Sequence, residues 1–116
     1  HPAVMTRLVD SAQYGNTYMP EEVLSDLFNG LFVRNEDPDT FKRNIQSAYV
    51  DGLISAFKED SEYDEISKAA VFTSLTKIQD FTKGNFRDSE TKSHYQYLNW
   101  KVTNFLDGKA FNFLEK

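Results

Sequence analysis

Hydrophobic residues recur along this chain at the three- and four-residue spacing of an amphipathic α-helix. Five segments show the pattern: residues 3–10, residues 20–32, a segment that follows Asp37, one between Ser61 and Gly84, and one from Asp88 to Asp107. Pro and Gly stand mostly between these segments, where they break helices. The pattern therefore predicts an all-α fold, an irregular antiparallel bundle of four main helices plus a short N-terminal helix, in a single domain over residues 1–116.

Residues that favour helix ends lie at the expected boundaries. Ser61 with Asp64 three residues later resembles a capping box, and Gly84 is a candidate for the end of the same helix. The remaining predicted signals are Pro20 and Pro38 at first helical positions and Asp37 and Asp88 as N-caps. These signals predict short connections, so consecutive helices should be antiparallel neighbours.

The third and fourth helices differ in their apolar faces. On the third, one face is predicted from Phe41, Ile45, Tyr49, Leu53 and Phe57. Gly52 interrupts this helix, and we expect it to allow close approach by a neighbour, with a kink as the alternative. The fourth helix is apolar on most sides, which is typical of a helix buried between others. Its apolar residues include Ile66, Ala69, Ala70, Val71, Phe72, Leu75, Ile78 and Phe81.

The fifth segment carries most of the aromatic residues of the C-terminal third. One stripe is formed by Tyr95, Leu98, Val102, Phe105 and Leu106, and we expect it to face the core. Tyr97 and Trp100 point away from that stripe, which predicts a second surface that something covers. The chain's own tail could cover it, with Phe111 and Phe113 folding back, or another domain or a small molecule could do so.

The charge of the chain makes nucleic acid an unexpected partner. The formal net charge is -5 with a pI near 4.9, whereas proteins that bind a phosphate backbone usually concentrate Lys and Arg on one face. No apolar run approaches the roughly 20 residues that span a bilayer, so no membrane span is expected. The chain has no Cys. It opens with His1-Pro2, which suggests a domain cut from a longer polypeptide or a processed chain.

No catalytic or metal-binding motif stands out. His1 and His94 are the only histidines, and Glu90, one turn before His94, predicts a surface hydrogen bond and not a metal site. Ser93 adjoins His94, but neighbouring helical residues face different directions. The acidic residues near 59–65 lack the central Gly of an EF-hand loop. We therefore expect no catalytic residue, no metal ligand and no cofactor in this chain, although 18 acidic residues leave an autonomous small enzyme open.

The order of the segments resembles the C-terminal helical region of bacterial zinc-dependent metalloproteases of the Met-zincin type. The resemblance rests on "VMTRLVD", "YMPEEVLSDLFNGLF", "FKRNIQSAYVDGLI" and "DSETKSHYQYLNWKVTNFLD", and covers residues 4–107. Arg43, Gln46 and Tyr49 match the family's R-x-x-Q-x-x-Y helix most closely. The His-Glu-x-x-His zinc motif and the methionine turn of that family do not occur in this sequence.

The resemblance implies a non-catalytic accessory domain of an exported zinc peptidase. Zinc would then belong to the catalytic domain of the parent polypeptide, which would be this domain's partner, and the location would be periplasmic or at the cell surface. Arg43, Gln46, Tyr97 and Trp100 are the candidate contacts with that partner. The alternative is a stand-alone helical module for protein–protein interaction.

Overall fold

The structure, a computed structural model, describes residues 20–58, 61 and 63–115, so the helix expected at residues 3–10 lies outside the described part. Its elements are α2 (Glu21–Phe28), the π-helical turn η1 (Asn29–Val33), α3 (Thr40–Ser55), α4 (Glu65–Thr82) and α5 (Ser89–Glu115). The described residues contain no strand. The all-α prediction is therefore confirmed.

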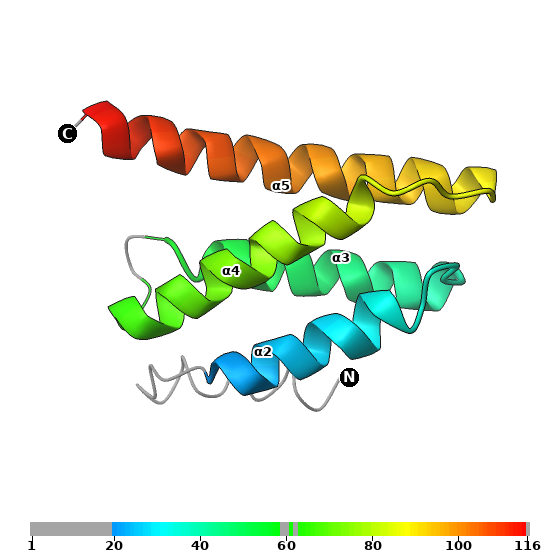
Figure 1. The fold of residues 1–116 in the computed structure, drawn as a ribbon, viewed down its shortest axis with the longest axis horizontal. Coiled ribbons are helices and arrows are strands. Elements are labelled where there is room, and N and C mark those ends of the chain that lie inside the picture. The colour runs from blue at the N-terminus through cyan, green and yellow to red at the C-terminus, as the bar shows by residue number, and fades with distance from the viewer. Residues whose placement is uncertain (1–19, 59–60, 62, 116) are drawn as a thin grey trace.

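The four helices pack with α4 at the centre. Figure 1 shows α5 along the top, α3 below it and α2 at the bottom, while α4 crosses them obliquely. Helix α4 contacts α2, α3 and α5, and α3 contacts α5 directly. Each helix runs opposite to the one before it, as the colours in Figure 1 show. The architecture is the predicted irregular antiparallel bundle.

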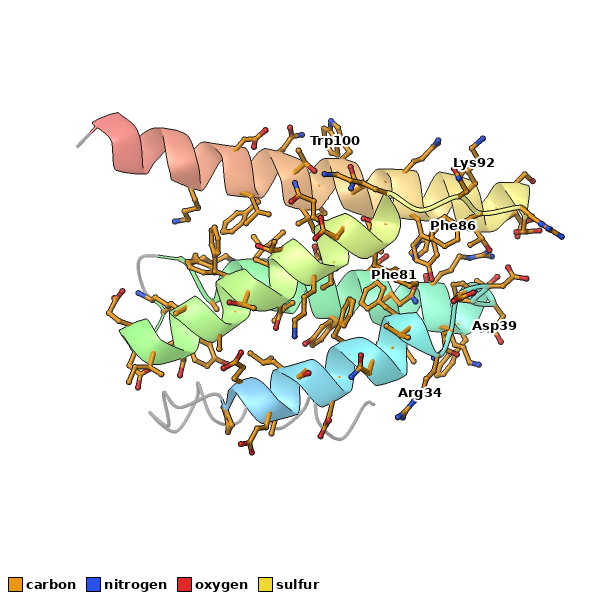
Figure 2. All side chains as sticks on the ribbon, viewed as in Figure 1. Arg34, Asp39, Phe81, Phe86, Lys92 and Trp100 are labelled. Atoms are coloured by element: carbon orange, nitrogen blue, oxygen red, sulfur yellow. The ribbon has the colours of Figure 1, made fainter. Side chains whose placement is uncertain are left out.

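The core combines aliphatic residues with an aromatic cluster near η1 that includes Tyr95 of α5. Phe32 is fully buried and lies 5.8 Å from Phe28 and 5.9 Å from Phe81, measured between ring centroids. Phe81 meets Tyr95 edge to face at 5.5 Å, a geometry that aromatic pairs favour. Figure 2 shows Phe81 and Phe86 directed toward the interior of the bundle. This aromatic cluster joins α2, α4 and α5 into one core.

The wide turn η1 continues α2 and brings Phe32 under Phe28. Its backbone bond runs from the Arg34 N–H to the Asn29 carbonyl at 2.9 Å, the five-residue spacing of a π-helix. The side-chain amide of Asn35 also donates to the Gly30 carbonyl. Sequence periodicity alone predicts a continuous α-helix here, because the extra residue of a π-turn leaves no signature in the apolar pattern.

Asp side chains cap the starts of α3, α4 and α5, whereas Pro20, predicted at the first position of α2, is its N-cap and provides no side-chain bond. Asp88 accepts a 2.9 Å hydrogen bond from the Thr91 N–H, as predicted. Asp39 caps α3 instead of Asp37, and Pro38 is buried ahead of the helix. Asp37 instead accepts a 2.5 Å bond from the Thr91 hydroxyl. The start of α3 is displaced because Asp37 is used to tie this loop to α5.

Helix α4 also begins and ends differently from its prediction. Its N-cap is Asp64, whose carboxylate accepts the Ser67 N–H at 2.7 Å, and not Ser61. Its C-cap is Lys83, which has a right-handed backbone. Gly84 follows and donates its N–H to the Phe81 carbonyl at 3.2 Å. An Asp binds the free N–H groups of a first turn as well as a Ser does, so sequence alone left the choice open.

Several residues expected in the core lie at the surface. Phe41 is 67% exposed and Ile66 is 72% exposed. The buried face of α3 is rotated from the predicted one and consists of Gln46, Tyr49, Val50, Leu53 and Ala56. Helix α4 buries Ser67, Ala70, Val71, Ser74, Leu75, Ile78 and Thr82, while Phe72 is exposed. An all-round apolar pattern fixes no face by itself, so the neighbouring helices select it.

The role predicted for Gly52 is wrong. A Cβ placed on Gly52 would meet nothing within 4 Å, so no neighbour needs the close approach. The tail expectation is also wrong, because α5 continues through Gly108 to Glu115 and does not turn back over Tyr97 and Trp100. The stripe of α5 is confirmed: Tyr95, Leu98, Val102 and Leu106 are buried and Phe105 packs against them.

Candidate functional site

A buried amide organises the polar contacts between α3, α5 and the end of η1. The side chain of Gln46 is fully buried. Its Nε2 donates to the Leu31 carbonyl at 2.7 Å and to the Tyr95 hydroxyl at 3.2 Å. The Tyr95 hydroxyl in turn donates to the Asn35 carbonyl at 2.9 Å. Gln46 therefore satisfies a carbonyl at the end of a helical turn that has no intrahelical partner.

This arrangement fixes the tautomer of His94. Both protons of the Gln46 amide are used by oxygen acceptors, so its Oε1 is left to face His94 Nε2 at 2.8 Å. An amide oxygen only accepts, so Nε2 of His94 carries the proton. Burial, and then the positive charge of Arg43, lower the pKa of His94 below its usual value. At neutral pH the imidazole is therefore uncharged, with its lone pair on Nδ1.

Arg43 lies at the edge of this network. Its guanidinium donates to Glu90 at 3.1 Å and to the Thr40 hydroxyl at 3.0 Å. The surface bond predicted between His94 and Glu90 is wrong, because Glu90 pairs with Arg43 and His94 bonds to Gln46. The pair is partly exposed, since 75% of the Glu90 side chain is accessible. Exposed ion pairs of this kind contribute about 0–1 kcal/mol to the stability of a fold. The pair therefore holds the Arg43 side chain in place and adds little to the free energy of unfolding.

The hydrogen bonds of Gln46 connect α3 to η1 and α5 inside the bundle. No Ser, Thr or Tyr hydroxyl among the described residues donates a hydrogen bond to His94, whose Nε2 faces the Gln46 amide oxygen. In the same part of the chain, no three His, Cys, Asp or Glu side chains are grouped as metal ligands. None of its helices is long and apolar enough to cross a membrane.

The second arrangement is an aromatic pair on the outer face of α5. Tyr97 and Trp100 stack with their ring centroids 6.4 Å apart and 30° between the planes. They are 50% and 62% exposed, respectively. Figure 2 shows Trp100 directed away from the rest of the bundle. Beside them, Lys101 forms an ion pair with Asp51 of α3 and lies 5.8 Å above the Tyr97 ring. We call Tyr97 and Trp100 the aromatic pair.

The four residues predicted as partner contacts thus fall into two groups. Tyr97 and Trp100 lie together at the surface, three positions apart on one helix. Gln46 has no accessible surface, so it is an internal residue and we exclude it from the candidate surface. Arg43 is in contact with Glu90 and influences His94, and it does not touch the aromatic pair. The candidate site is therefore the aromatic pair and its surroundings.

The sequence contained a signal for the buried amide that periodicity analysis missed. Gln46, Tyr49, Val50 and Leu53 follow the i, i+3, i+4, i+7 spacing of a core-facing stripe. A Gln at the first position of such a stripe indicates a buried amide that needs partners. The pairing of His94 with Gln46 joins residues 48 positions apart, and no local pattern reports that.

Comparisons with protein-family models, curated proteins and solved structures give no match for this chain. The resemblance to the helical region of Met-zincin metalloproteases therefore receives no support from them and stays a prediction.

Proposed function

We propose that this chain is a helical accessory domain that binds another folded protein through the outer face of α5. The observation that supports the proposal is the aromatic pair. The two rings are stacked on each other and half or more exposed, and adjoining apolar side chains on a surface mark interaction sites more often than single ones do. Tyr and Trp are also the residues that most often dominate the binding energy of protein interfaces.

The rigidity of the pair favours docking. The rings lie on the central part of α5, whose opposite side is anchored in the core by Tyr95, Leu98 and Val102. Lys101 is held beside Tyr97 by its ion pair with Asp51. A partner therefore meets side chains that have already lost much of their freedom, which lowers the entropic cost of association.

The partner we propose first is the catalytic domain of an exported zinc peptidase on the same polypeptide. That choice rests on the segment order of the sequence, and the zinc and the catalytic residues would belong to that domain. A periplasmic or cell-surface location accompanies this proposal. If the partner is a separate protein instead, the chain is a stand-alone interaction module with the same docking face.

The test is site-specific photo-crosslinking in cells that naturally make the protein. The photoreactive residue p-benzoylphenylalanine replaces Trp100, Tyr97 or, as a matched control, Phe41, which is an exposed aromatic of α3. We expect one partner sequence to be recovered from positions 97 and 100 and not from position 41. Mass spectrometry of the crosslinked peptides identifies that sequence.

Each outcome decides between the proposals. A crosslinked sequence from a domain with a His-Glu-x-x-His motif supports the peptidase assignment. A different protein, recovered repeatedly, retains the docking face and replaces the assignment with the stand-alone module. Crosslinks that are as frequent and as varied at position 41 as at positions 97 and 100 refute docking through the aromatic pair.

A further inference from the structure

A polar hollow lies between the end of α4, the turn that follows it and α5, and its α5 wall includes Gln96 and Asn99, which precede Tyr97 and Trp100 in the sequence. Its volume is about 320 Å³. We call it the lysine hollow, after Lys83 and Lys92, which line it from the two sides together with amide side chains. The amides and the remaining lining residues are Asn85, Gln96, Asn99, Thr82, Gly84 and Phe86. No carboxylate lines the hollow.

Both lysines that line the hollow are without an ion-pair partner among the described residues. Within the described residues, neither Lys83 nor Lys92 forms an ion pair, whereas Lys101, Arg43 and Lys68 do. Asn99 donates its amide to the Gln79 carbonyl at 2.9 Å, so it shapes the wall and is not free to bind. The side chains left to meet a ligand are both lysines and the exposed amides of Asn85 and Gln96, and a lysine offers donors only.

Two acidic residues at the start of α5 are engaged by other groups. Asp88 accepts the Thr91 N–H, and Glu90 pairs with Arg43. Asp80, near the end of α4, is exposed but does not line the hollow. Residues 66–109 hold seven Lys or Arg against four Asp or Glu, whereas residues 20–65 hold four against twelve. Residues 66–109 thus carry a net positive charge of three within an acidic protein, while the charges of α5 itself balance. The positive charge at the hollow comes from Lys83 and Lys92, and it attracts a negatively charged partner.

The hollow and the aromatic pair are aligned along one helix. Lys92, Gln96 and Trp100 follow each other at four-residue spacing, so they lie near one side of α5. Figure 2 shows Lys92 on α5 between Trp100 and the start of the helix. At 1.5 Å per residue, the eight residues from Lys92 to Trp100 span about 12 Å.

We propose that the lysine hollow binds a carboxylate of an acidic protein segment whose apolar side chain packs on Trp100. This inference rests on the proposed docking function and adds the chemistry of the partner. An extended chain rises about 3.3 Å per residue, so an Asp or Glu and an apolar residue four positions apart match the 12 Å span. Charge selects the segment, and the aromatic contact contributes most of the apolar burial.

The probe is a synthetic peptide with one Glu and one Leu four residues apart in a Gly-Ser background, titrated into the full chain. Amide and indole resonances are followed by two-dimensional NMR. We expect shifts confined to residues around Lys83, Lys92, Gln96 and the Trp100 indole. Replacing the Glu of the peptide by Gln is expected to weaken binding by about tenfold, the effect of losing two exposed charge contacts.

Variants separate this inference from the function on which it rests. The double change Lys83→Gln with Lys92→Gln is expected to weaken peptide binding about tenfold, while Lys42→Gln, an exposed lysine of α3, leaves it unchanged. If Trp100→Ala abolishes binding but the double variant does not affect it, docking stands and the carboxylate site is refuted. Equal shifts from inorganic phosphate alone, or no shift at 5 mM peptide, also refute the site, and neither result affects the crosslinking test.

Discussion

The most informative perturbation of the fold is Gln46→Leu, because it removes three hydrogen bonds while nearly preserving volume. The Leu31 carbonyl loses the Gln46 amide, which is its only described partner. The Tyr95 hydroxyl keeps its bond to the Asn35 carbonyl. His94 is half-buried, so its Nε2 can turn to water. The substitution therefore leaves one buried acceptor without a partner.

The expected magnitude follows from that count. An unsatisfied buried polar group costs about 1–3 kcal/mol and each lost hydrogen bond about 1 kcal/mol. Burial of the leucine side chain in place of an amide returns about 1 kcal/mol. The expected net loss is about 2 kcal/mol in the free energy of unfolding. With a urea dependence of about 2 kcal/mol per M, the unfolding midpoint falls by about 1 M.

Urea denaturation followed by circular dichroism and by tryptophan fluorescence measures this loss, and coincidence of the two signals checks that unfolding is two-state. The control is Gln96→Leu, the same chemical change at an exposed position of α5, with an expected effect within about 0.5 kcal/mol. A Gln46→Leu protein as stable as the wild type, or more stable, would show that the buried amide does not stabilise the junction of η1, α3 and α5.

Three further predictions concern single groups. Gly52→Ala should raise the free energy of unfolding by about 1 kcal/mol, since Ala is the better helix former and its Cβ has room. Gly84→Ala should show no such gain, because its Cβ would meet Phe86 at 3.3 Å. Thermal melts of the two variants test the difference. Tyr49→Phe should be neutral or stabilising by about 1 kcal/mol, because the buried Tyr49 hydroxyl has no hydrogen-bond partner among the described residues; a loss of more than 1 kcal/mol in urea would point to an overlooked partner. Folding lowers the pKa of His94, so below about pH 6.5, the pKa of a free His, the unfolded chain binds more protons than the folded one. The free energy of unfolding should therefore fall as the pH drops below that value and be constant above it. Urea midpoints from pH 5 to 8 should show this slope in the wild type and a weaker one in His94→Gln.

The sequence predicted those parts of the fold that depend on one helix at a time. The stripe of Tyr95, Leu98 and Val102 and the exposure of Trp100 follow from a period of 3.6 residues on α5 alone. The rotated face of α3 was not predictable in the same way. Phe41 and Tyr49 belong to one series of apolar residues spaced every four positions, yet of these two only Tyr49 is buried. The buried side of α3 depends on α5 and η1, because His94 and the Leu31 carbonyl bind the Gln46 amide.

Some features of the candidate site depend on one helix alone, and others depend on contacts between helices. The aromatic pair follows from local spacing, because residues three apart on a helix are neighbours. The lysine hollow does not, because Lys83 and Lys92 come from different sides of the α4–α5 turn. Which acids are already paired, such as Asp51 with Lys101, is also a tertiary property. The sequence gives the charged residues, but it does not tell which of them are already paired within the fold and which are left to bind a partner.

The dependence of the Gln46 network on α5 has a consequence for how the chain acquires its structure during synthesis. His94 and Tyr95 lie about fifty residues after Gln46 and sixty after Asn35. Until that segment has left the ribosome, the end of η1 and the Gln46 amide remain hydrated, and the aromatic cluster of Phe32 and Phe81 lacks its Tyr95 wall. Helices α2, α3 and α4 are therefore expected to remain incompletely packed until α5 has left the ribosome, and cooperative folding of the bundle follows the emergence of α5.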